Sequence, residues 1–125
     1  MSYNISLWTT KKLRDLVIPL DAFYEHRRAD WHPASPELIE AETNLVELVC
    51  GCGQTIRGTL KDRLLSVSEF DMNGEGSGTF YSWILEPALR KSTGELDAVL
   101  IWENGDSVQR LKVKDGIVST EEIDL

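Results

Sequence analysis

Two dipeptides near the C-terminal end, Asn104-Gly105 and Asp115-Gly116, constrain the fold of this chain more than any other feature. Asn, Asp and Gly tolerate the positive φ angles of two-residue hairpin turns, so both dipeptides predict tight turns between antiparallel strands. The stretches 96–103, 107–114 and 117–123 flank these turns and have the apolar and polar alternation of strands. We therefore predict a three-stranded antiparallel meander at the C-terminus.

The lengths of the two turns also predict the register of the meander. The expected cross-strand partners are Ile101 with Val108, Val99 with Arg110, Asp97 with Lys112, Val113 with Val118, Arg110 with Glu121, Val108 with Ile123 and, at the tip, Glu103 with Asp106. This register aligns aliphatic residues in one row and forms two opposite-charge pairs, each contributing roughly 0.2–1 kcal/mol. A slip of one residue would lose all of these contacts. Only the two like charges at the tip, Glu103 and Asp106, are unfavourable in the predicted register.

The rest of the chain predicts further strands and short helices. Alternation at Tyr3, Ile5 and Leu7 indicates a strand, while Pro19 and Pro36 suit the first turn of a helix. We predict helices over 19–28 and 36–43, strands over 45–50, 54–60, 64–72 and 79–86, and a glycine-rich loop over 73–78. A helix continuing to about position 49 is the alternative to the strand over 45–50. The predicted fold class is a β-rich α+β protein, with an antiparallel sheet of about six strands and one or two short N-terminal helices.

Length and targeting signals bound the organisation of the chain. A chain of 125 residues corresponds to about one domain, so we predict a single domain over 1–125. The longest apolar runs are far shorter than the roughly 18 residues of a membrane-spanning helix, and the N-terminal residues lack the pattern of a secretory signal. Cys50 and Cys52 are separated by one residue, which is too close for an unstrained disulfide. These features predict a cytoplasmic protein without a membrane partner.

The charge of the chain is negative and unevenly distributed. The formal net charge is −8, and residues 94–125 hold eight acidic against three basic side chains. This balance disfavours nucleic acid as a partner, because phosphates are bound by clustered Lys and Arg. We predict a non-enzymatic binding protein that contacts a basic macromolecular partner, with the general profile of an immunity protein or nuclease inhibitor. The predicted partner-binding residues are Glu103, Asp106, Glu121, Glu122, Asp124 and, as an aromatic anchor, Trp31.

Two other classes of function stay open from the residues alone. Four tryptophans in a chain of this length suggest a small-ligand pocket lined by aromatic side chains, between the sheet and the helix that begins at Pro19. Cys50, Cys52, His26 and His32 provide the donor types of a zinc site or a thiol enzyme. The one-residue gap between the cysteines is shorter than structural zinc sites use, and no signature of a cysteine nucleophile is present. We therefore predict no metal or other cofactor and favour the binding protein.

Overall fold

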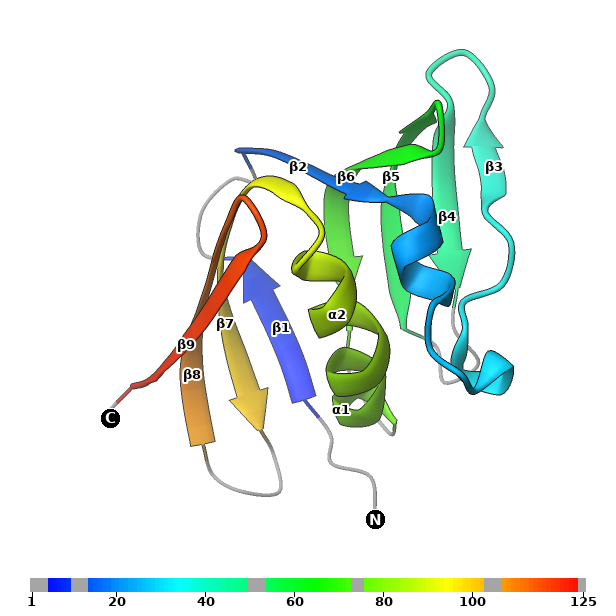
Figure 1. Ribbon diagram of the computed structural model, residues 1–125. Helices are drawn as coiled ribbons and strands as arrows, with labels where there is room; N and C mark the ends of the chain where they lie inside the picture. Colours follow the sequence, from blue (N-terminus) through cyan, green and yellow to red (C-terminus); the bar gives the residue numbers. More distant parts are fainter. Residues whose placement is uncertain (1–4, 10–13, 50–53, 73–75, 103–106, 124–125) are drawn as a thin grey trace.

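The computed structural model describes residues 5–9, 14–49, 54–72, 76–102 and 107–123 (Figure 1). Within these ranges, nine strands form one antiparallel sheet: β1 (Ile5–Thr9), β2 (Arg14–Pro19), β3 (Glu37–Glu40), β4 (Leu45–Val49), β5 (Thr55–Lys61), β6 (Leu64–Asp71), β7 (Thr93–Trp102), β8 (Ser107–Lys114) and β9 (Ile117–Glu122). The helical segments are η1 (Leu20–Tyr24), η2 (Ala29–Trp31) and a continuous run of α1 (Ser77–Phe80), η3 (Tyr81–Leu85) and α2 (Glu86–Leu89). The β-rich antiparallel architecture is confirmed, with more strands than the predicted six.

The C-terminal meander has the register that its turns predict. The partners Ile101 with Val108, Val99 with Arg110, Asp97 with Lys112, Val113 with Val118 and Arg110 with Glu121 are all observed. The backbone N–H of Ile123 donates to the carbonyl of Val108 at 2.8 Å, which continues the β8–β9 ladder. Asp115 and Gly116 both have positive φ angles, 45° and 83°, as a two-residue hairpin turn requires. The predicted turn at 104–105 and the pair of Glu103 with Asp106 lie outside the described residues.

Strand β2 joins the two halves of the sheet. The order along the sheet is β3-β4-β5-β6-β2-β7-β8-β9, and β1 pairs with β7 on the side that β2 also uses. Within β2, Val17 has a partner on each neighbour, Thr93 of β7 and Ser66 of β6. The meander of β7, β8 and β9 is therefore continuous with a second unit, β3 to β6, whose far edge is β3.

The strand predicted over 79–86 is wrong, because this segment is helical. Its aromatic and β-branched residues have high strand propensity. In the structure Phe80, Tyr81, Ile84, Leu85 and Ala88 are nevertheless all buried, at spacings that fit one face of a helix. The run begins after Gly76, whose φ of 84° reverses the chain, and Pro87 lies within its last part rather than ending it. Packing of this face against the sheet overrides the local preference.

The predicted N-terminal helices are only partly observed. The helix expected over 19–28 is the shorter 3-10 helix η1, and Pro19 is its N-cap and the last residue of β2. The helix expected over 36–43 is wrong: these residues form β3 and the turn that leads into β4, where Asn44 has a φ of 59°. The strand at Leu45–Val49 is confirmed, because it pairs with both β3 and β5.

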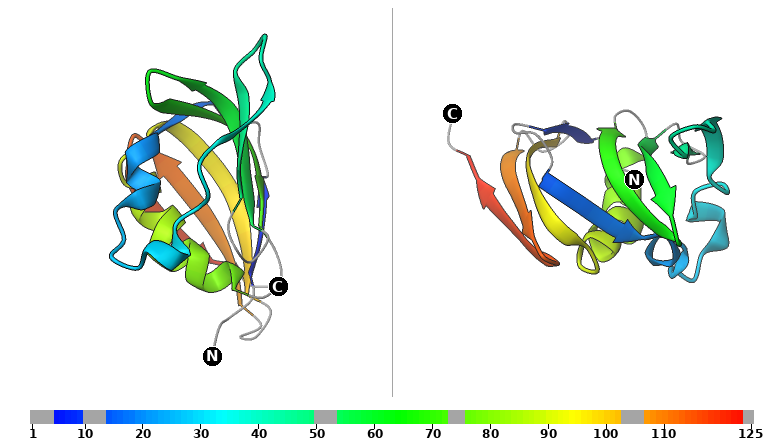
Figure 2. Two further views of the ribbon diagram at one scale, coloured as in Figure 1. Left: turned by 90° about the vertical axis from the view of Figure 1, so that its right-hand side faces the viewer. Right: turned by 90° about the horizontal axis from the view of Figure 1, so that it is seen from above.

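One hydrophobic core lies between the sheet and the helical segments, which cover a single face of the curved sheet (Figures 1 and 2). Fully buried side chains come from both halves of the sheet and from the helices, including Leu48, Ile56, Leu100, Phe23 and Phe80. The opposite face carries the other half of each strand's side chains, since neighbours along a strand point to opposite faces. That exposed face therefore bears the polar side chains of the strands.

Candidate functional site

The exposed face of β3 to β6 holds a row of charged side chains. Val46, Leu48 and Ile56 are buried in the core, so Glu47 and Arg57 between them point to the opposite face. The strand register extends this row in both directions. Glu47 is the partner of Glu37 on β3, and Arg57 is the partner of Glu69 on β6. We call Glu37, Glu47, Arg57 and Glu69 the acidic row.

Arg57 is the only cation of the acidic row and is already paired with two of its carboxylates. Its Nε lies 2.7 Å from Oε2 of Glu47, and a terminal nitrogen lies 3.1 Å from Oε2 of Glu69. The hydrogen bond with Glu47 raises the pKa of Arg57 above its ordinary value, and Glu69 adds to this effect. Three carboxylates and one guanidinium leave the row with a formal excess of two negative charges.

The carboxylate of Glu37 has no compensating cation among the described residues. It lies directly opposite Glu47, and Glu47 is bound to Arg57 on the other side. Like charges that face each other across two strands destabilise a sheet. Glu37 is also exposed to solvent, so its charge is available to another molecule. This end of the row is therefore an unbalanced negative site next to the edge of the sheet.

Strand β3 is itself unusual for an edge strand. All four of its residues are exposed, and the two central ones are the large aliphatic side chains Leu38, 57% exposed, and Ile39, 50% exposed. Large apolar side chains that cluster on a surface commonly mark an interaction site. The acidic row and the exposed apolar pair thus meet at the same edge.

The exposed face of the meander, in contrast, is close to neutral. It carries Glu95, Asp97 and Glu121 together with Arg110, Lys112 and Lys114. Arg110 donates to both carboxylate oxygens of Asp97, at 3.3 and 2.9 Å, and Lys114 lies 3.9 Å from Glu95. The hydrogen bonds to Asp97 raise the pKa of Arg110, with a smaller contribution from Glu121. Balanced cations therefore offset the acidic surface predicted for this part of the chain.

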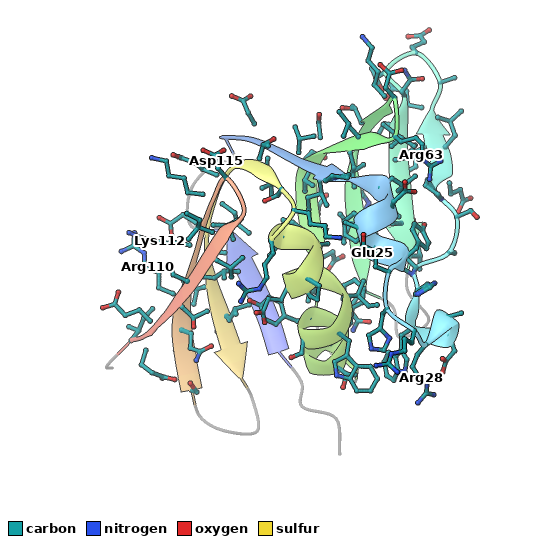
Figure 3. All side chains as sticks on the ribbon, viewed as in Figure 1. Glu25, Arg28, Arg63, Arg110, Lys112 and Asp115 are labelled. Carbon is teal, nitrogen blue, oxygen red and sulfur yellow. The ribbon has the colours of Figure 1, made fainter. Side chains whose placement is uncertain are left out.

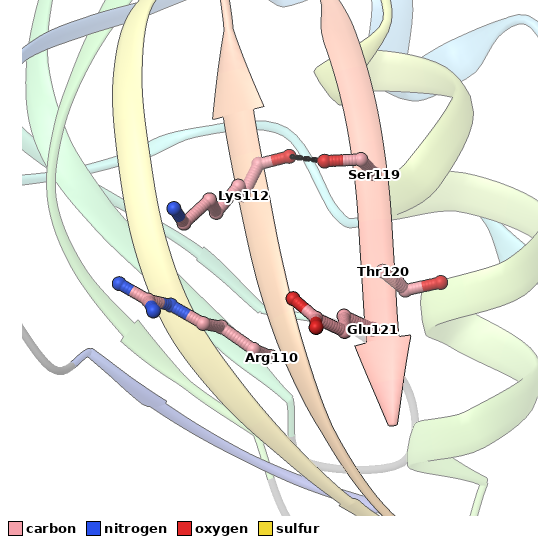
Figure 4. A pocket seen from close by; sticks show the side chains of 5 residues that line it. All are labelled: Arg110, Lys112, Ser119, Thr120 and Glu121. Carbon is pink, nitrogen blue, oxygen red and sulfur yellow. Dashed lines mark hydrogen bonds between the residues drawn. The ribbon is translucent and has the colours of Figure 1, made fainter. Parts of the chain in front are cut away.

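A shallow pocket of about 210 Å³ lies on this meander face (Figure 4). It is lined by Arg110, Lys112, Ser119, Thr120 and Glu121. The carboxylate of Glu121 points toward β8, on the side where the two cationic side chains extend, while Thr120 points away from them (Figure 4). Because Glu121 shares this pocket with two cations, it does not present an isolated negative charge.

The six predicted partner-binding residues do not form one surface among the residues described. Glu122 lies on the other face of β9 from Glu121, and accepts hydrogen bonds from Ser107 at 2.9 Å and from Gln109 at 3.1 Å. Trp31 lies in η2, whose N-cap Arg28 is on the opposite side of the molecule from Arg110 (Figure 3). Glu103, Asp106 and Asp124 lie outside the described residues.

Trp31 belongs to an aromatic cluster that sequence analysis did not identify. Its ring packs edge-on against Trp83, with centroids 5.3 Å apart, and His26 stacks on Trp83 at 5.0 Å. The indole N–H of Trp31 is buried and has no hydrogen-bond partner among the described residues. The two tryptophans are far apart in sequence, so no local pattern indicated their contact. Trp31 is half-buried rather than a freely exposed anchor.

The structure brings the two histidines together, and one ring nitrogen of each makes a hydrogen bond with the backbone. Nε2 of His32 donates to the carbonyl of His26 at 2.6 Å, and Nδ1 of His26 accepts from the backbone N–H of Arg28 at 3.0 Å. Cys50 and Cys52 lie outside the described residues. Across the residues that are described, no three His, Cys, Asp or Glu side chains are grouped so that they could hold a metal ion.

A second cavity, of about 180 Å³, lies between the helical run and the β8–β9 hairpin. Its lining residues are Tyr81, Ser82, Glu86, Arg90, Gln109, Val118 and Thr120. It differs from the predicted pocket, since it adjoins α2 and η3 rather than η1 and has one tyrosine and no tryptophan in its wall. Its volume is also below the roughly 300 Å³ at which small-molecule sites begin.

Tyr81, in the wall of this cavity, provides a test of the packing there. Burial raises the pKa of its phenol above the ordinary value of 10.0; Glu86 adds to the shift and Arg90 opposes it. Above about pH 10 the unfolded chain therefore binds fewer protons than the folded one, and the free energy of unfolding decreases as the pH rises, by at most about 1.4 kcal/mol per pH unit. We expect Tyr81→Phe to remove this decrease in the free energy of unfolding, which urea denaturation at pH values from about 9 to 11 would measure. An identical decrease in both proteins would contradict the buried phenol.

Comparisons with protein-family models, with curated proteins and with solved structures found no match for this chain. In the described part of the chain, no helix combines the length and the apolar character that crossing a bilayer requires.

Proposed function

We propose that this protein is a non-enzymatic binding protein that docks a basic protein partner on the exposed face of β3 to β6. The observation that carries the proposal is the position of Glu37, whose carboxylate faces that of Glu47 without a cation of its own. A lysine or arginine of a partner, placed beside Glu37, would complete the alternation of charge that Arg57 begins on the other side of Glu47. The acidic row is thus complementary to a cationic surface.

The arrangement has a cost that binding would offset. A like-charge pair directly across two strands lowers stability by a few tenths to about 1 kcal/mol, and a lysine at the edge would avoid it. A cationic partner offsets this repulsion, because each of the two carboxylates then has a positive charge beside it. Complementary charge chiefly accelerates association and selects the partner, while apolar contacts supply much of the affinity. Leu38 and Ile39 provide such apolar contacts at the same edge.

Among basic proteins, the partner class we favour is one whose cationic surface is itself functional, such as a nuclease. An acidic protein that covers such a surface acts as an immunity protein or inhibitor. The meander face is a weaker candidate for this role, because its three carboxylates are matched by three cations. The proposal therefore assigns docking to the half of the sheet opposite the one that the sequence pattern indicated.

The test exchanges the charge at Glu37. We expect Glu37→Lys to weaken binding of a short lysine homopeptide by about 1.4-fold to fivefold, since each exposed ion pair contributes about 0.2–1 kcal/mol. The same variant should gain roughly 0.2–1 kcal/mol in its free energy of unfolding, because the new side chain faces Glu47 with the opposite charge. Isothermal titration calorimetry at low and high salt measures the first effect, and urea denaturation measures the second.

The matched control is Glu121→Lys, which changes the net charge by the same amount on the neutral meander face. It should reduce peptide binding much less than the change at Glu37. Equal losses in the two variants would show that net charge alone attracts the peptide. Binding that does not respond to salt in the wild-type protein would likewise contradict an electrostatic docking face.

A further inference from the structure

The edge of β3 offers backbone groups as well as side chains to a partner on the proposed docking face. Among the described residues, β3 pairs with β4 only and ends the strand order of the sheet (Figure 1). One side of an edge strand presents N–H and C=O groups that no neighbouring strand satisfies. Another extended chain can add to such an edge as a further strand, with backbone hydrogen bonds giving affinity and side chains giving specificity.

The charges along β3 determine what kind of strand fits. Glu37 and Glu40 mark the two ends of this four-residue strand. A second copy of the chain, added through β3, would bring these carboxylates against each other or against Glu47 nearby. Like charges placed in this way destabilise strand pairing, so the edge is protected against self-association. The same charges attract a strand that carries lysine or arginine.

The two faces of β3 differ in chemistry, which gives a pattern for the added strand. Glu37 is the partner of Glu47 and belongs to the exposed acidic face, whereas Leu38 is the partner of the buried Val46 and belongs to the core side of the sheet. Because side chains alternate along a strand, a matching segment would alternate basic and apolar residues. Its basic residues would extend the acidic row, and its apolar residues would cover Leu38.

We infer that β3 accepts an extended segment of the basic partner as an additional strand, with basic side chains on the acidic face and apolar side chains over Leu38. This inference rests on the proposed function and specifies how the partner is bound. The bulge between Leu38 and Glu40 interrupts the regular edge, so the recognised segment is short. A folded basic surface without a free extended segment would not be bound in this way.

The experiment compares two peptides of about seven residues with identical composition and charge. In one, lysine and valine alternate; in the other, the lysines and the valines form separate blocks. Strand addition requires the alternating pattern, and its added backbone hydrogen bonds correspond to about tenfold tighter binding or more. Calorimetry measures the affinities, and amide hydrogen exchange measures protection at β3. Strand β9, at the other end of the sheet, is the internal control.

The expected result is preferential binding of the alternating peptide, with slower amide exchange in β3 and unchanged exchange in β9. Equal affinities for the two peptides, or unchanged exchange in β3 when the peptide is bound, would overturn strand addition. If Glu37→Lys still weakened peptide binding in that case, the proposed docking on the acidic face would be supported and only strand addition would be wrong. Failure of both peptides to bind at millimolar concentration would overturn both the inference and the proposed function.

Discussion

Replacing Gly58 with alanine should lower the free energy of unfolding by about 3 kcal/mol or more, a value at the upper end for overpacking in a well-packed site. An added Cβ would lie 2.3 Å from the carbonyl oxygen of Ser66 and 3.0 Å from its carbonyl carbon. Both atoms are backbone atoms of β6, which pairs with β5 at this point, so they cannot rotate away as a side chain would. Relief requires the two strands to separate, next to the register shift between Arg57 and Gly58.

The matched control for this variant is Thr59→Ala, on the same strand at an exposed position. It should change stability by less than about 0.5 kcal/mol. Urea denaturation followed by far-ultraviolet circular dichroism measures both variants. A Gly58→Ala protein as stable as the wild type would show that β5 and β6 do not approach each other closely at this point. The acidic row would then lose its geometric basis, because it crosses the same two strands.

Phe80→Ala should cost about 3–5 kcal/mol, the range for removing a buried phenylalanine from a core. Phe80 is 1% exposed and lies at the start of the helical run, among the largest fully buried side chains of the described residues. Its removal leaves a cavity between the helix and the sheet that neighbouring side chains fill only in part. The loss should appear as a lower urea midpoint with an unchanged dependence on urea concentration, because the fold itself is retained.

Ser82→Ala provides the control for Phe80, because Ser82 is exposed on the same helical run. The pair also tests the secondary structure of this segment. In a strand over 79–86, positions 80 and 82 would share one face, so both substitutions would affect the core or neither would. In the observed helix they face different environments. Similar effects of the two substitutions would therefore contradict the helical assignment.

The two halves of the sheet have different electrostatic roles, and this follows from cross-strand pairing. On the exposed face of the meander, each of Glu95, Asp97 and Glu121 has a cation nearby, as in the ion pair of Asp97 with Arg110. In the acidic row, Arg57 is paired with two of the three carboxylates, and Glu37 has no cation of its own among the described residues. An unbalanced negative charge therefore lies in the acidic row, although the excess of acidic residues in the sequence is concentrated in residues 94–125. Counting charges along the chain could not distinguish these cases.

The C-terminal meander could be predicted from local sequence patterns alone. Each turn dipeptide selects a two-residue hairpin, and side-chain alternation then permits a single register, which the observed partners match. These constraints act between residues close in sequence, so they can be read without knowing the rest of the fold. The strands at Thr55–Lys61 and Leu64–Asp71 were also predicted from local patterns, whereas for the strand at Leu45–Val49 a helix was the alternative.

The remaining features follow from contacts in the folded protein that local patterns do not specify. The helix over 77–89 exists because its apolar face is buried against the sheet, in spite of residues with strand propensity. Likewise, β3 is a strand because β4 offers it a partner, although Pro36 suits the start of a helix. The acidic row has no signature in the chain, since its four members come from four strands. Pairing of the consecutive strands β3 to β6 brings them together, and the register shifts between Leu38 and Glu40 and between Arg57 and Gly58 mean that side-chain alternation alone does not give this alignment.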